Sequence, residues 1–573
     1  MRVWAPRPNT VELEIHGRRL PMAREADGWW NSEVEAAPGD DYAFVLDRSE
    51  PPLPDPRSQW QPMGVHGPSR VVDHGAFAWT DARFRAAPLP SAILYELHIG
   101  TFSPAGTFDG AIENLDHLVR LGVTHVNVMP VAEFSGSHGW GYDGVDLYAP
   151  HHCYGGPDGF KRFVDACHAR DLAVILDVVY NHLGPAGNYL DRFGPYFTAR
   201  YSTGWGAAVN FDQAGSDEVR AFVVDNARMW LRDYHVDGLR LDAIHAIVDM
   251  SAFHVLEELR MAVDTLQAEL ARPLVLIVES DLNDPRLLRP KESGGLGMDA
   301  QWSDDFHHSL HALLTGERSG YYADYGEVAH LAKALREAFV YDWRHATSRG
   351  RRHGRSAAGL SASRFLAYAQ NHDQVGNRAG GERLSHLVSP ALLKVSAAVV
   401  LLAPFVPMLF QGAEWGSSSP FLFFTDHRDP DLAEAIRQGR RAEFEAFGWS
   451  PDDVPDPQDP ATLARSKLDW AAASEGVHAE LLEWYRCLIA LRRKTPALLD
   501  GLLETVHVSW DESARWLVAR RGDTELAVNL GPTQVVPLAD PGGSTILLAS
   551  AGAQLDENGV RLDAEAVVVI RRA

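Results

Sequence analysis

The chain has 573 residues, 46% of them hydrophobic and 23% charged, so it is long enough for two to four globular domains with a sizeable core. A formal net charge of −24 and the lack of a long basic run argue against nucleic acid as a partner. Three scattered cysteines exclude a disulfide framework, and the N-terminus has no apolar signal core. The longest apolar run, 396–410, is too short to span a membrane and holds two prolines. We therefore expect a soluble, cytoplasmic protein that does not associate with membranes.

The first region alternates apolar and polar residues up to about residue 72, as in 11–17 and 42–47, with Gly, Pro and Asp between these runs. This pattern is typical of a small β-sandwich. A proline-rich stretch and a linker follow it. We assign residues 1–90 to an N-terminal immunoglobulin-like β-sandwich with its linker.

The middle region, residues 91–498, alternates short apolar runs with helical patterns such as 110–122, 158–171 and 217–234. Eight runs are predicted as buried strands: 92–99, 124–130, 172–180, 236–242, 273–280, 297–303, 364–373 and 405–412. Eight units of this kind predict a (β/α)₈ TIM barrel with loop insertions. An open doubly wound sheet is the alternative, but the Gly-rich phosphate loop that usually follows its first strand is missing.

The last region returns to short strand patterns, at 505–510, 515–522, 525–531 and 566–572. We therefore predict a C-terminal β-sandwich domain over residues 499–573. The chain contains no internal repeat at the periods of solenoids or propellers. The predicted fold class is thus α/β, with a TIM barrel between two β domains.

Polar side chains gather where four of the predicted barrel strands end. They are Asp177, Asn181 and His182 on the third strand, Arg240, Asp242 and His245 on the fourth, Glu279 on the fifth, and His372 and Asp373 on the seventh. In a barrel of this type the active site lies at the carboxyl ends of the strands. A helix cap explains any one aspartate. Four polar tips on one rim instead indicate a functional site.

The fourth strand suggests the chemistry. Strand side chains alternate faces, so Arg240 and Asp242 share one face while Leu239 and Leu241 share the other. Such an arginine can keep the carboxylate ionised and oriented, although a structural salt bridge is the alternative. Glu279 on the next strand supplies a second carboxyl. A retaining glycosidase uses two carboxyls about 5–5.5 Å apart, and wider spacing implies inversion.

Four strand-end sequences carry a resemblance to a known superfamily: "DVVYNH", "GLRLDAIH", "VES" and "QNHDQ". In this order they resemble the signature regions of the α-amylase superfamily of glycoside hydrolases. The flanks "GWGYDGVDLYAPHHCYGG", "ESDLNDPR" and "NHDQVGNR" resemble the maltooligosyltrehalose trehalohydrolase family within it. The resemblance implies hydrolysis of the α-1,4 bond next to a terminal trehalose, with maltooligosyltrehalose and related α-glucans as substrates and no cofactor.

Two alternatives remain open. A glucan branching or debranching enzyme would use the same scaffold, and a non-catalytic glucan-binding protein could have kept the fold. The complete carboxylate set argues against the second alternative. The sequence leaves the oligomeric state open.

The resemblance also assigns residues. It makes Asp242 the nucleophile, Glu279 the general acid/base and Asp373 the carboxylate that holds sugar hydroxyls and stabilises the transition state. His182, Arg240 and His372 match supporting residues around the reacting sugar, and Tyr142 matches the aromatic that stacks on it. One departure is Ala413, which stands where many relatives carry a glutamate.

Loop residues are candidates for the leaving-group side. Asn377 and Arg378 follow the seventh strand, and Asp426 lies in the loop 422–427. For Arg378 a surface charge is an equally good interpretation. Four aromatic residues are candidate sugar platforms, with core packing at least as good an explanation for each: Trp205, Trp302, Phe423 and Phe424.

We predict no metal site. His307, His308 and His311 have a spacing that could hold a metal, but no acid or cysteine pattern accompanies them. Asp177 and Asn181 resemble positions that help to bind calcium in some amylases, yet the usual partner loop is not evident.

Overall fold

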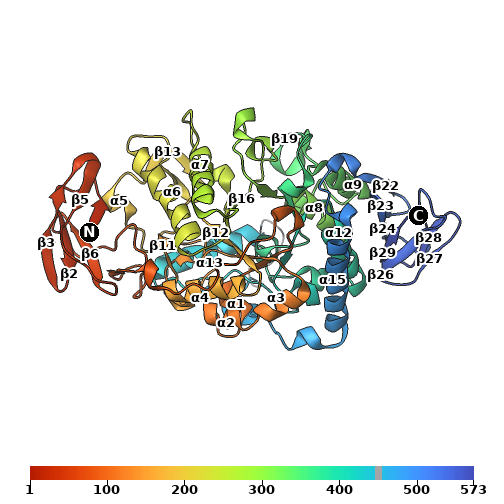
Figure 1. The fold of residues 1–573 in the computed structure, drawn as a ribbon, viewed down its shortest axis with the longest axis horizontal. Helices are drawn as coiled ribbons and strands as arrows, with labels where there is room; N and C mark the ends of the chain where they lie inside the picture. The colour runs from red at the N-terminus through yellow and green to blue at the C-terminus, as the bar shows by residue number, and fades with distance from the viewer. Residues whose placement is uncertain (446–453, 573) are drawn as a thin grey trace.

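The structure, a computed structural model, describes residues 1–445 and 454–572. Its centre is a closed barrel of eight parallel strands, with sheets of the two terminal regions at opposite ends of the molecule (Figure 1). The barrel strands are β8 (Leu94–Leu97), β9 (His125–Val128), β12 (Ala173–Val178), β15 (Gly238–Leu241), β16 (Val275–Val278), β17 (Ala300–Trp302), β20 (Phe365–Ala367) and β21 (Val406–Phe410). Each lies within one of the eight predicted runs, so the predicted TIM barrel is confirmed.

Helices connect the barrel strands along the chain. The longer connecting helices are α4 (Gly156–His168), α6 (Ser216–Asp233), α7 (Val255–Leu270), α8 (Asp304–Thr315) and α12 (Pro390–Leu402), and α13 (Pro430–Glu445) and α15 (Gly476–Lys494) follow the last barrel strand. The sequence sets the start of α12: the Ser389 hydroxyl accepts from the backbone N–H of Leu392, and Pro390 occupies the first turn. A proline there sacrifices no helical hydrogen bond. Helix α15 packs against α12, whose last eight residues are buried.

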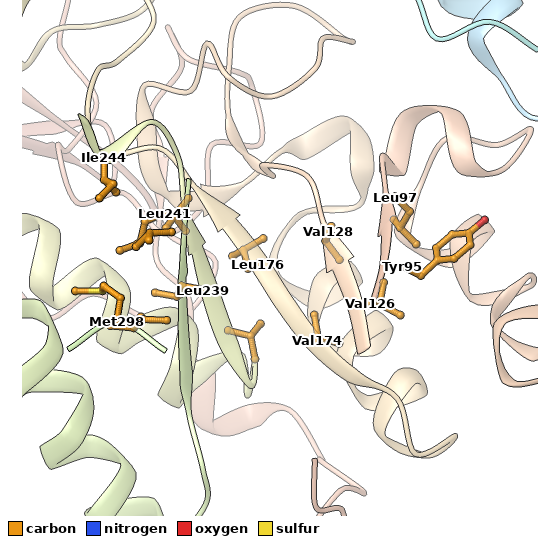
Figure 2. Close-up of a cluster of buried hydrophobic side chains, with 14 of the residues drawn as sticks. Tyr95, Leu97, Val126, Val128, Val174, Leu176, Leu239, Leu241, Ile244 and Met298 are labelled. Atoms are coloured by element: carbon orange, nitrogen blue, oxygen red, sulfur yellow. The ribbon is translucent and has the colours of Figure 1, made fainter. Parts of the chain in front are cut away.

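The two faces of the barrel strands have different roles. Outward-facing side chains form one continuous apolar layer across neighbouring strands (Figure 2): Tyr95, Leu97, Val126, Val128, Val174, Leu176, Leu239 and Leu241. The other face fills the barrel interior with a separate apolar cluster that includes Leu94, Ile175, Ile277, Leu366 and Met408. This alternation follows from the two-residue period of a strand.

The inner face changes from apolar to polar towards the carboxyl ends of the strands. The change occurs from Leu94 to Glu96, from Ile175 to Asp177 and from Ile277 to Glu279. The strand register sets Asp177 opposite Arg240 and Arg240 opposite Ile277. Asp242 and Glu279 follow directly after their strands. One rim of the barrel therefore receives the acids of three adjacent strands.

Three hairpins that the sequence analysis did not predict are inserted between the barrel strands. They pair β10 (Ala132–Glu133) with β11 (Asp146–Pro150), β13 (Phe197–Thr203) with β14 (Gly206–Val209), and β18 (Asp342–Ala346) with β19 (Arg351–Gly354). Their strands, of two to seven residues, lack a long run of alternating apolar and polar residues. The first hairpin carries Tyr142 and the second carries Trp205 in the segments between their strands.

The N-terminal region contains two antiparallel sheets. One has the order β1 (Arg2–Trp4), β5 (Trp29–Asn31), β4 (Ala23–Arg24), and the other β3 (Arg18–Pro21), β2 (Val11–Ile15), β6 (Asp41–Leu46), β7 (Ser69–Arg70). Trp4 and Trp30 pack in its interior.

The C-terminal region contains a five-stranded and a three-stranded sheet. Their orders are β22 (His507–Asp511), β23 (Trp516–Arg521), β24 (Thr524–Asn529), β29 (Ala566–Arg571), β26 (Thr545–Ala549), and β25 (Gln534–Pro537), β28 (Gly559–Leu562), β27 (Ala553–Leu555). The four strands predicted there correspond to β22, β23, β24 and β29. The domain limits 1–90, 91–498 and 499–573 stay predictions. Within the described residues, no helix has both the length and the apolar character needed to cross a bilayer.

Candidate active site

A pocket of about 320 Å³ opens at the carboxyl ends of the barrel strands. Seven of the ten predicted site residues line it: Tyr142, His182, Arg240, Asp242, Glu279, His372 and Asp373. Trp140, Trp205, Ala243 and His245 complete its wall. Residues from six separate stretches of the chain therefore converge on one cavity.

Arg240 lies buried in this pocket and contacts three carboxylates from three neighbouring strands. Its Nη1 donates to Asp177 Oδ2 at 2.6 Å and to Asp242 Oδ1 at 2.9 Å, and its Nη2 donates to Glu279 Oε2 at 2.7 Å. The guanidinium carbon also lies 4.2 Å from the centre of the Trp302 ring. Trp302 is buried and packs against this arginine, so it is a core residue and the prediction of a sugar platform there is wrong.

The three acids around Arg240 differ in their protonation. Burial raises the pKa of Glu279 well above its ordinary value, Asp242 and Asp373 raise it further, and Arg240 opposes the shift. Burial also raises the pKa of Asp177, to about 7. Burial would raise the pKa of Asp242 too, but Arg240 and the Asn181 amide, which donates at 2.8 Å, outweigh it and lower that pKa. The pocket therefore favours an ionised Asp242 beside a protonated Glu279.

His372 is paired with an acid that the sequence analysis missed. Its Nδ1 lies 2.7 Å from Glu96 Oε1, and its backbone N–H donates to Glu96 Oε2 at 2.9 Å. Burial would lower the pKa of His372, but the charge and hydrogen bond of Glu96 raise it overall. Glu96 lies on the inner face of β8. The signal in the sequence was one glutamate within the apolar run 92–99.

Helix capping accounts for part of the unusual polarity of the segment after β20. The Asn371 side chain accepts from the backbone N–H groups of Asp373 and Gln374 at the start of helix α10 (His372–Gly376), and the Gln374 side chain accepts from the Asn371 backbone N–H. These two amides are therefore structural. His372 and Asp373 line the pocket instead.

Aromatic rings form one wall of the pocket. The Tyr142 ring stacks on His372 with 5.1 Å between centres, and its hydroxyl donates to Asp177 Oδ2 at 2.8 Å. The Trp205 ring stacks on His182 at 4.5 Å and 5°. Trp205 is 53% exposed, so one ring face is open to a ligand at the pocket edge. Of the remaining aromatic candidates, Phe424 is buried in the core.

The three predicted leaving-group residues are not among the described residues that line this pocket. Asn377 donates to Asp373 Oδ1 at 2.7 Å. Arg378 forms an ion pair with Glu317 at 2.8 Å. Asp426 accepts from the backbone N–H and the hydroxyl of Ser137, at 2.7 and 2.8 Å. Their contacts with a leaving group stay predictions.

The histidines on helix α8 have protein partners. His307 lies 2.9 Å from the Ala369 carbonyl and 2.9 Å from the Tyr322 hydroxyl, and His311 Nε2 lies 2.6 Å from Glu317 Oε2. These contacts give two of the three histidines a structural role. The expectation that the trio binds no metal stays a prediction.

A TIM barrel with an ionised and a protonated carboxyl side by side at its strand ends fits a retaining glycoside hydrolase. Family models agree: the α-amylase catalytic domain matches residues 75–201, and a domain of unknown function, DUF3459, matches residues 501–569. The malto-oligosyltrehalose trehalohydrolase of Mycobacterium tuberculosis is 49% identical, over 100% of this chain and 99% of that protein. Its counterpart in Saccharolobus solfataricus is 42% identical, over 98% and 96%. The chain belongs to the malto-oligosyltrehalose trehalohydrolase family.

Solved structures agree in fold. A crystal structure described as a candidate α-amylase from Salmonella typhimurium has a TM-score of 0.92 and 39% identity, covering 100% of this chain and 97% of that one. A pullulanase from an Anoxybacillus species, solved with maltotetraose, has a TM-score of 0.74 and 20% identity, covering 100% and 86%. The second similarity concerns the fold alone.

Glu96→Gln is expected to lower the pKa of His372, because the stabilising carboxylate is removed while the burial remains. Ring-¹⁵N NMR of histidine-labelled protein across pH measures this, with His372→Gln used to assign the resonance. Glu292→Gln, at an exposed position, is the matched control. An unchanged His372 titration in Glu96→Gln would contradict the role given to Glu96.

Proposed function

We propose that this chain hydrolyses the α-1,4-glucosidic bond next to the terminal trehalose of maltooligosyltrehalose, releasing trehalose and a maltooligosaccharide. The observation that carries the proposal is the pair Asp242 and Glu279, held by one guanidinium with pKa shifts of opposite sign. Two carboxyls in opposite protonation states are what a retaining glycosidase requires. Similarity along the whole chain to relatives named for this activity supports the substrate.

In the first step Glu279, as general acid, gives its proton to the glycosidic oxygen. Asp242 attacks the anomeric carbon from the opposite face, the bond to oxygen breaks, and trehalose leaves with the proton. Each Asp242 oxygen accepts a single protein hydrogen bond among the described contacts, from Arg240 or Asn181. Each Asp242 oxygen therefore keeps a lone pair with which it can attack the anomeric carbon. The product is a glycosyl ester of Asp242.

In the second step Glu279, now ionised, takes a proton from water. The water oxygen attacks the anomeric carbon, the ester bond breaks, and Asp242 regains its charge. Asp373 and His372 hold hydroxyls of the same sugar ring, and these bonds help catalysis to the extent that they strengthen as the ring flattens. Two inversions give net retention of configuration at the new reducing end.

The runner-up is a glucan branching or debranching enzyme. A branching enzyme of Pseudoalteromonas atlantica is 30% identical, but over 60% of this chain. Incubation with maltooligosyltrehalose and with a linear maltooligosaccharide, followed by product analysis, distinguishes these activities. A protein that binds glucan without turnover would yield no product from either substrate.

Asp242→Asn and Glu279→Gln are each expected to lower kcat by about three orders of magnitude or more, because the two groups act as one unit. Initial rates of trehalose release measure the loss, and thermal unfolding confirms an intact fold. Glu292→Gln, an exposed residue in the loop after β16, is the matched control and keeps the wild-type rate. A folded variant of Asp242 or Glu279 with more than a few per cent of the wild-type rate would contradict the assigned role.

The pH dependence of kcat/KM is expected to be bell-shaped. Activity requires an ionised Asp242, so it falls as the pH drops through the lowered pKa of that group. It also requires a protonated Glu279, so it falls as the pH rises through that group's raised pKa. In Glu279→Gln the residual activity should lose its basic limb.

A second variant tests whether Asp177, rather than Glu279, is the acid behind the basic limb. Asp177 contacts the same arginine, and burial raises its pKa to about 7, so it is a second acid that loses its proton as the pH rises. Asp177→Asn should shift the basic limb without removing it. Loss of that limb in Asp177→Asn, together with its retention in Glu279→Gln, would make Asp177 the acid.

Specificity is expected to favour maltooligosyltrehalose over a maltooligosaccharide of equal length by at least a hundredfold in kcat/KM. Trehalose joins two glucoses head to head and is sharply bent, so a linear leaving group would leave polar partners unpaired. Each unpaired group costs about 1–3 kcal/mol, so two cost about 2–6 kcal/mol, or roughly thirtyfold to twenty-five-thousandfold, and a hundredfold corresponds to about 2.7 kcal/mol. Equal rates on both substrates, or formation of α-1,6 branches, would favour the runner-up activity.

A further inference from the structure

Four metal-ligating side chains meet at the base of the β10–β11 hairpin, outside the described lining of the active-site pocket. Glu133 ends β10, and His151, His152 and Cys153 follow β11 directly. One ligand atom from each of the last three residues lies within 4.8 Å of the other two. We propose that this cluster binds one divalent metal ion of the zinc class, independently of the hydrolytic site.

Two contacts of the cluster match a known arrangement of zinc ligands. His152 Nδ1 lies 2.7 Å from Glu133 Oε1, and His152 Nε2 lies 3.2 Å from Cys153 Sγ. A carboxylate on one ring nitrogen orients the imidazole so that the other nitrogen can bind metal. With Zn–N near 2.1 Å and Zn–S near 2.3 Å, tetrahedral ligand atoms lie about 3.3–3.6 Å apart, so His152 and Cys153 already have nearly this spacing.

His151 supplies the independent observation. Its side chain is 0% exposed, Glu133 is its ion-pair partner on the Nδ1 side, and among the described residues its Nε2 has no hydrogen-bond partner. The ring is held in place by stacking on Phe134 at 3.8 Å, and its Nδ1 lies 3.3 Å from Glu133 Oε1 without hydrogen-bond geometry. A buried ring nitrogen without a partner is unfavourable, and a cation bound at Nε2 would supply the partner that this nitrogen lacks.

The donor set selects the class of ion. Two imidazoles and a thiolate favour zinc and similar borderline-soft metals, whereas magnesium and calcium prefer oxygen ligands. Glu133 either orients His152 or completes the coordination. The site can be loaded from solvent, because the His152 side chain is 27% exposed and Cys153 is half-buried.

The position of the cluster suggests its effect on the protein. Glu133 and His151 flank the segment that carries Trp140 and Tyr142 into the active-site pocket. Backbone pairing already joins the two ends of this segment, with Ala132 opposite Pro150. A metal bound between them would cross-link the same two ends and raise the stability of the folded state.

The test uses the full chain, freed of metal with a chelator. Calorimetric titration with Zn²⁺ is expected to give one site per chain, and Co²⁺ is expected to give a thiolate-to-metal charge-transfer band with a tetrahedral d–d spectrum. Cys153→Ser should weaken Zn²⁺ binding at least tenfold and remove the charge-transfer band. Cys487→Ser, the same substitution at the other half-buried cysteine, should preserve both signals. Mg²⁺ should not bind.

A measurement on the wild-type protein tests the metal site without a substitution, so its result does not depend on how a variant folds. Bound Zn²⁺ should slow the alkylation of Cys153 by iodoacetamide at least tenfold, with no change at Cys487, as read by peptide mass spectrometry. Absence of stoichiometric Zn²⁺ binding, a charge-transfer band that persists in Cys153→Ser, or equal alkylation with and without Zn²⁺ would overturn the proposal.

Discussion

One buried guanidinium, that of Arg240, holds together the acids of three adjacent strands. A charge moved out of water costs free energy, and here each charged partner offsets the cost for the other. The contacts of 2.6 to 2.9 Å with Asp177, Asp242 and Glu279 leave Arg240 no room to shift without losing one of them. The rim of β12, β15 and β16 is therefore aligned by charge as well as by the backbone ladder. Arg240 sets the spacing of Asp242 and Glu279 together with the Asn181 amide, which donates to Asp242, and the Ala243 backbone N–H, which donates to Glu279.

The same constraint produces chemical asymmetry. One cation cannot balance three ionised acids in a buried site, so the protons distribute unevenly. Asp242 has the additional Asn181 amide and keeps its charge, whereas Glu279 is favoured in its neutral form. Glu96 and His372 form a second compensated pair beside them. Because Asp242 and the Glu96–His372 pair have charged partners in the protein, a neutral sugar can displace water from them without leaving an isolated buried charge.

Much of the fold could be predicted from the sequence because the barrel strands are apolar runs with polar ends. The alternation of Leu239 and Leu241 with Arg240 was enough to separate the outer from the inner face. Glu96 shows the limit of this reasoning: a lone acid inside an apolar strand has no local pattern, and its partner His372 lies 276 residues away. Closure of the barrel brings Glu96 and His372 together, and no local sequence pattern indicates which strands become neighbours on closure.

The positions of the loop residues, unlike those of the strand residues, are not set by a hydrophobic period. Arg378 meets Glu317 across 61 residues and Asp426 meets Ser137 across 289, in segments without a hydrophobic period that would fix their position. The groups at the strand ends line the pocket, whereas Arg378 and Asp426 are not among its described lining, and their part in substrate selection stays a prediction. The pullulanase fold match at 20% identity fits a barrel that is kept while sequence changes around it. A change of substrate on this scaffold can therefore come from the loops, provided that the contacts of Arg240 stay intact.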